Sequence, residues 1–153
     1  MINPMQYWSD LWAFSLSMGR SASQIAEIAE ASNRVIGRRS EIIADAMQDP
    51  LNGDYDELGK MVPEKLEAFG AAGQAMMKGV AASQGLMLAN MQAMAGMAMG
   101  HAPSVSSAMS LAQRNAKAMR EAGRTVEQSI APIHALSTAN DRRLAKTRRT
   151  RSR

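Results

Sequence analysis

The chain has 153 residues, which is enough for one ordinary domain or for a few long helices. Its apolar residues are mainly 27 Ala and 14 Met, against only 25 residues of Leu, Ile, Val and Phe together. These 25 make about 16% of the chain, below the roughly 20% of well-packed globular domains. β-branched and aromatic residues are too scarce for sheets, whereas Ala and Met favour helices. The composition therefore argues against all-β and α/β folds and predicts an all-α fold.

The charge is unevenly distributed. Residues 142–153 carry seven basic and no acidic side chains, whereas residues 1–141 hold 11 basic and 14 acidic ones. Like charges at every one to three positions predict that residues 141–153 form a disordered tail after a helical domain, residues 1–140. The basic tail residues, which could contact a polyanion, are Arg142, Arg143, Lys146, Arg148, Arg149, Arg151 and Arg153.

Three long helices are expected, separated by proline and glycine. The first spans about residues 4–48 and ends before Pro50, because the residue before a proline resists helix. A turn follows, with a short helical piece capped by Asp54. The second helix is predicted to begin at Pro63 and to span residues 63–100. The third is predicted for residues 104–140, with a bend near Pro132.

Apolar or small residues recur at alternating spacings of three and four along the first two helices. This heptad signature predicts an elongated helical bundle or coiled coil. The heptad stripe of the first helix comprises Trp8, Leu11, Ser15, Met18, Ala22, Ile25, Ala29, Ser32, Ile36, Ile43 and Ala46. That of the second comprises Leu66, Phe69, Gly73, Met76, Val80, Ser83, Met87, either Asn90 or Met91, Met94 and Ala98. The residues predicted to form oligomer contacts are Ile25, Ile36, Ile43, Leu66, Phe69, Met76 and Val80.

Two segments indicate contact with an apolar surface. Four of the six aromatic residues lie within residues 7–14, and the apolar residues there spread over about 200° of helix circumference, more than a two-helix contact needs. They could lie at an apolar–water interface or lock the end of a bundle. Residues 79–113 contain no ionisable acid or base except His101, yet their polar residues and glycines argue against a membrane span. The expected apolar-surface residues are Trp8, Leu11, Trp12, Phe14, Met87, Met91 and Met94.

The sequence contains no motif typical of a catalytic site. His101 and His134 have no motif spacing, and the acids of residues 49–57 match turn and cap positions better than a calcium loop. The absence of cysteine excludes disulfides and thiolate chemistry, and is compatible with a reducing cytoplasm. No signal-peptide pattern occurs at the N-terminus. We expect no enzymatic activity and no catalytic, metal or cofactor site.

The chain resembles the phasins, helical proteins that coat polyhydroxyalkanoate storage granules in bacteria. The resemblance rests on Gln6-Tyr7-Trp8, on DPLNGDYDELGKMVPEKLEAFGAAGQAM at residues 49–76, and on the Ala/Met/Gly-rich helix that follows. It implies a non-enzymatic, homo-oligomeric protein of the cytoplasm that sits on the granule surface and prevents granules from fusing. A polymer synthase is a further candidate partner.

Two alternatives depend on surface binding of another kind. The basic tail could make the protein a nucleic-acid-binding or nucleoid-tethering adaptor, because such a run neutralises phosphates without reading sequence. The helices could also coat a membrane surface. Because all apolar stripes lie upstream of residue 141, removal of residues 142–153 is expected to leave helicity and granule association nearly intact.

Overall fold

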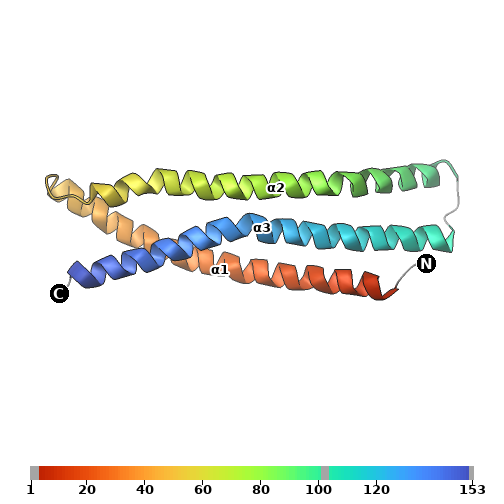
Figure 1. Cartoon of the computed structure of the whole chain (residues 1–153), viewed down its shortest axis with the longest axis horizontal. Helices are drawn as coiled ribbons and strands as arrows, with labels where there is room; N and C mark the ends of the chain where they lie inside the picture. Colours follow the sequence, from red (N-terminus) through yellow and green to blue (C-terminus); the bar gives the residue numbers. More distant parts are fainter. Residues whose placement is uncertain (1–3, 101–103, 152–153) are drawn as a thin grey trace. The chain divides into compact units, whose positions relative to one another are not determined.

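The computed structural model describes residues 4–100 and 104–151. They form three helices, α1 (Pro4–Gln48), α2 (Tyr55–Ala98) and α3 (Val105–Arg151), which pack together (Figure 1). No strand occurs in these residues. The predicted all-α fold is therefore confirmed, whereas the coiled coil remains a prediction.

The turn between α1 and α2 agrees with the sequence. The Asn52 side chain donates to the Asp49 carboxylate at 2.8 Å, and the Tyr55 hydroxyl donates to the Pro50 carbonyl at 2.8 Å. The backbone N–H of Glu57 donates to Asp54 Oδ1 at 3.2 Å, which satisfies one of the first amides of α2. The predicted capping by Asp54 is confirmed.

The predicted start of the second helix at Pro63 is wrong. Pro63 lies inside α2, which begins eight residues earlier and runs through it. An interior proline removes one backbone donor and costs about 3 kcal/mol, but the helix on both sides is held by other helices through Glu57 and Glu64. After α2, Gly100 has φ 84°, the left-handed conformation that commonly follows a helix end.

The predicted end of the third helix near residue 140 is also wrong. α3 continues to Arg151, so residues 141–151 are helical rather than a disordered tail. The reason is tertiary: Asp141 and Arg143 form ion pairs with the other two helices, and Leu144 is only 5% exposed. Residues 152 and 153 lie outside the described part.

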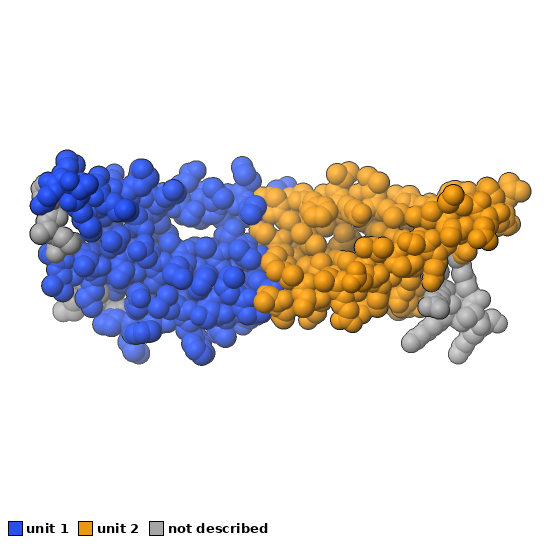
Figure 2. Space-filling view, turned by 180° about the vertical axis from the view of Figure 1, so that it is seen from behind, with its two compact units in different colours: residues 1–21, 74–128 blue, residues 22–73, 129–153 orange. Residues whose placement is uncertain are grey.

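The chain forms two compact units, residues 1–21 with 74–128 and residues 22–73 with 129–153 (Figure 2). Each unit contains a segment of all three helices. In unit 1, Gly79 lets α2 approach α3 closely, and Gly123 lets α3 approach α1 closely. A Cβ at Gly79 would lie 2.1 Å from the Thr125 side chain, and one at Gly123 would lie 3.1 Å from the Phe14 ring.

Most residues of the heptad stripes do not make the contacts between helices of one chain. Most of the residues that do so precede a heptad residue by one position, about 100° around the helix, whereas Arg39 and Ala46 are buried at heptad positions. We call these buried and half-buried residues the contact stripe. On α1 it comprises Asp10, Phe14, Ser17, Ser21, Gln24, Ile28, Ala31, Val35, Arg39, Ile42 and Ala46. On α2 it includes Glu57, Glu64, Ala68, Ala72, Ala75, Gly79, Leu86, Asn90 and Ala93. Small and polar side chains thus fill much of the interior, beside the larger apolar Phe14, Ile28, Val35, Ile42 and Leu86.

Candidate functional site

The N-terminal aromatic residues divide between surface and interior. Trp8 and Trp12 are 68% and 69% exposed, and the ring of Tyr7 packs edge-on against Trp8 with centroids 5.5 Å apart. Leu11 is half-buried, and Phe14 is half-buried on the contact stripe against Gly123 of α3. The two tryptophans therefore have the exposure that an apolar-surface contact needs, whereas Phe14 packs inside unit 1, in agreement with the alternative that the aromatics lock the end of a bundle.

The expected surface methionines of α2 are all exposed. Met87, Met91 and Met94 expose 67%, 59% and 65% of their area. The helix around them carries no acidic or basic residue from Gly79 to its end at Ala98. The second helix thus presents an uncharged apolar surface, which monomeric soluble proteins rarely expose.

The residues predicted to form oligomer contacts are exposed as well. Their exposed fractions run from 41% at Ile43 to 70% at Leu66, and the other members are Ile25, Ile36, Phe69, Met76 and Val80. In unit 2, Ile36, Ile43 and Phe69 line an open groove of about 510 Å³, together with Ile133 and Leu136 of α3. These side chains have no apolar cover within the described chain.

Polar contacts, by contrast, join the helices inside unit 1. Arg120 Nη1 donates to Asp10 Oδ1 at 2.7 Å, and Asp10 is only 4% exposed. The Ser17 hydroxyl donates to Glu127 at 3.0 Å. On the other side of α3, the Asn90 amide donates to Asn115 at 2.7 Å. The helices are therefore held in register by hydrogen bonds on the contact stripe, while the apolar side chains lie beside it.

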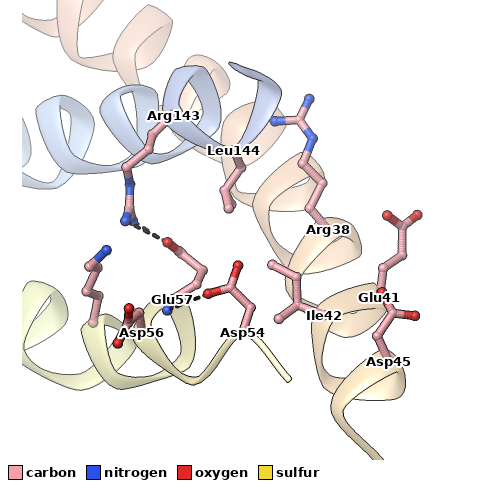
Figure 3. A pocket seen from close by; sticks show the side chains of 10 residues that line it. Arg38, Glu41, Ile42, Asp45, Asp54, Asp56, Glu57, Arg143 and Leu144 are labelled. Carbon is pink, nitrogen blue, oxygen red and sulfur yellow. Dashed lines mark hydrogen bonds and ion pairs between the residues drawn. The ribbon is translucent and has the colours of Figure 1, made fainter. Parts of the chain in front are cut away.

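An ion-pair cluster holds the three helices of unit 2 together, and Figure 3 shows its pair between Arg143 and Glu57. Arg39 of α1 donates to Glu57 at 3.2 Å and to Glu64 at 2.9 Å on α2. Arg143 of α3 donates to the same two carboxylates at 2.6 and 2.8 Å, and Asn140 donates to Glu64 at 3.0 Å. The Arg39 and Glu57 side chains are only 7% and 9% exposed, so removal of either partner would leave a poorly solvated charge.

The sequence reasoning missed this cluster. Arg39 stands where the alternating spacing of the first helix calls for an apolar residue, and that interruption was the available signal. Arg143 was assigned to the polyanion-binding tail, but it is paired with Glu57 and Glu64. A second anchor nearby joins Asp141 to Arg38 at 2.8 Å.

Two of the other basic tail residues have described side chains. Arg142 and Lys146 are exposed on α3. The side chains of Arg148, Arg149, Arg151 and Arg153 lie outside the described part of the structure.

Arg34 of α1 also contacts this part of α3. It pairs with Glu30 and donates to Asp141 at 3.0 Å, and these hydrogen bonds raise the pKa of Arg34 above the ordinary value of arginine.

The histidines and acids show little that resembles a reactive site. His134 Nε2 lies 2.6 Å from the Glu27 carboxylate on α1, and His101 is outside the described residues. The pocket of Figure 3 lies beside the ion-pair cluster and is lined by five carboxylates and three basic side chains. Among the residues with described placement, no three His, Asp or Glu side chains are grouped so as to hold a metal ion.

No helix within residues 4–100 and 104–151 combines the length and the apolarity needed to cross a membrane. Comparison of the chain with protein-family models, with curated proteins and with solved structures found no match. The strongest candidate for a functional site is therefore the set of exposed apolar side chains on α1 and α2.

Proposed function

We propose that this protein is a non-enzymatic structural protein that coats polyhydroxyalkanoate storage granules in the bacterial cytoplasm and prevents their fusion. An aliphatic polyester granule presents an apolar surface to water. Helices that cover this surface with apolar side chains, and show charged ones to the solvent, lower the interfacial tension. The resemblance of residues 4–140 to the phasins supports the proposal.

The observation that carries the proposal is the position of the apolar side chains. Twenty-seven large apolar side chains of the described residues are exposed, whereas only Val35 and Leu144 among such residues are buried. Because the in-chain contacts use mainly small and polar residues, these exposed apolar residues are available without any separation of the helices. The bundle can therefore bind an apolar surface in its folded form.

The energetics of such binding are favourable. A tryptophan buries about 150–250 Å², so Trp8, 68% exposed, offers well over 100 Å² to a surface that covers it. At about 25 cal/mol per Å², coverage of half this residue contributes about 2 kcal/mol. Several such side chains on one helix face then outweigh the entropy lost on adsorption. The same faces would pair with each other when no granule is present, which gives homo-oligomers.

The nucleic-acid alternative depends on the basic residues after Asp141. Arg143 forms ion pairs with Glu57 and Glu64, so its charge is already used within the chain and contributes less to such binding. A gel-shift series on two unrelated duplexes at low and near-physiological salt tests it, with the full chain and a chain ending at Lys146. Salt-sensitive, sequence-indifferent binding by the full chain alone would assign polyanion binding to residues 147–153.

Flotation in a density gradient tests the granule proposal. The full-length protein is mixed with polyhydroxybutyrate particles, with neutral liposomes and with anionic liposomes of matched size. We expect the protein to rise with the polyester particles and to stay in the dense fraction with neutral liposomes. Equal flotation with anionic liposomes that salt abolishes would support the membrane-surface alternative. Absence from the polyester fraction would refute the proposal.

A further inference from the structure

The methionines of this chain lie at its surface. Of the 13 methionines in the described residues, 12 are exposed and only Met61 is half-buried. Methionine is ordinarily among the more buried residue types. Its exposure therefore requires another explanation than core packing.

The exposed methionines are concentrated on one face of α2 in unit 1. Met76, Met87, Met91 and Met94 fall within about 60° of the helix circumference, at 100° per residue. They are 59–67% exposed, and we call them the methionine face. Of the eight exposed large apolar side chains of α2 between residues 74 and 98, six are methionines.

The apolar face of α1 in the same unit is built differently. Its five exposed large apolar residues between positions 4 and 21 are Trp8, Trp12 and Leu16, which contain no sulfur, and Met5 and Met18. The apolar character of α2 in this unit, by contrast, depends largely on thioethers, and no charged side chain follows Lys78 in this helix. The two faces of unit 1 should therefore respond differently to an oxidant.

Hydrogen peroxide oxidises the thioether of methionine. The thioether sulfur attacks one peroxide oxygen, an S–O bond forms as the O–O bond breaks, and the second oxygen leaves as water after proton transfer. Methionine is oxidised by two electrons to the sulfoxide, and hydrogen peroxide is reduced to water. The sulfoxide is polar, so it disrupts methionine-rich contacts. The chain has no cysteine to compete for the oxidant.

We propose that the methionine face of α2 is an oxidation site through which hydrogen peroxide weakens attachment of the protein to apolar surfaces. The inference rests on the proposed function, because it concerns the same adsorbing faces. The bundle stays folded on oxidation, since these four side chains are largely exposed and make few in-chain contacts. The tryptophan-bearing face of α1 retains its own apolar residues, so binding weakens without being abolished. Methionine sulfoxide reductases reverse the change.

The test compares the wild-type chain with the variant M76L/M87L/M91L/M94L, because leucine is apolar and of similar volume but resists peroxide. Both proteins are bound to polyhydroxybutyrate particles before and after peroxide treatment. Mass spectrometry verifies the sulfoxides, and circular dichroism verifies the helices. We expect the oxidised wild type to bind at least about tenfold more weakly than the untreated protein, with unchanged helicity. Reductase treatment should restore binding. The leucine variant keeps eight other exposed methionines and should lose much less binding on treatment than the wild type.

Equal binding of the oxidised and reduced wild type would overturn the inference, as would an equal loss in the leucine variant. Loss of helicity in parallel with binding would overturn it too, since unfolding would then explain the effect. Hexadecane droplets serve as a second surface. Protein that binds droplets but not polyester refutes the granule proposal and still tests the oxidation site, whereas protein that binds neither refutes both.

Discussion

Truncation of α3 tests whether its last turns belong to the folded body. A chain that ends at Asp141 loses Arg143 and Leu144, whereas a chain that ends at Lys146 keeps both. Burial of Leu144, which is 5% exposed, contributes about 2 kcal/mol. Arg143 is 33% exposed, so its ion pairs contribute only about 1 kcal/mol after solvent screening. The shorter chain should therefore be about 3 kcal/mol less stable than the longer one.

Urea and thermal unfolding followed by circular dichroism measure this difference. For a chain of this size, about 3 kcal/mol corresponds to a midpoint lower by about 6–12 °C. The comparison revises the sequence-based expectation that residues 142–153 can be removed with little effect. Equal midpoints for the two truncated chains would show that Arg143 and Leu144 do not stabilise unit 2, and would refute the reasoning.

Two further comparisons use matched pairs of residues. The variant W8A/W12A should bind polyester particles at least about tenfold more weakly with little change in unfolding midpoint. F14A should lower the unfolding midpoint with little change in binding, because Phe14 packs against α3. Partitioning and thermal unfolding would contradict this if the two variants behaved alike. Replacement of Gly79 by Ala places a methyl group 2.1 Å from a threonine of α3 and should destabilise the chain, by about 1–3 kcal/mol. The same change at Gly85, where a Cβ meets nothing within 4 Å, should stabilise it by up to about 1 kcal/mol. Urea midpoints of the two proteins check the difference in sign.

Local signals sufficed for the helical class and for several helix ends. The end of α1 before Pro50 and the capping by Asp54 follow from backbone rules that act over a few residues. The continuation of α2 through Pro63 and of α3 beyond Asn140 could not be read in this way. The first depends on Arg39, which pairs with Glu64, and the second on Arg143, which pairs with Glu57. These side chains are distant in sequence and meet only after the helices have packed.

The register of packing was displaced by one residue for a physical reason. The heptad pattern was recognised from its large apolar members, such as Ile25 and Ile36. The contacts within the chain are instead made by neighbours such as Ser21 and Ala31, whose small side chains carry almost no hydropathy signal. A periodicity search therefore finds the exposed face of these helices before it finds the packed one. Of the residues assigned to an apolar surface, Trp8, Trp12 and the α2 methionines are exposed, whereas Leu11 and Phe14 are half-buried.

Tryptophan fluorescence tests the central claim most directly. Trp8 and Trp12 are the only tryptophans of the chain, and both lie on the exposed face of α1. Their emission therefore reports the environment of this face without any label. On polyhydroxybutyrate particles, the emission should shift to shorter wavelength and quenching by acrylamide should fall, while circular dichroism shows the same helicity as in solution. Particle-bound protein whose tryptophans keep the emission and the quenching of the free protein would contradict the account.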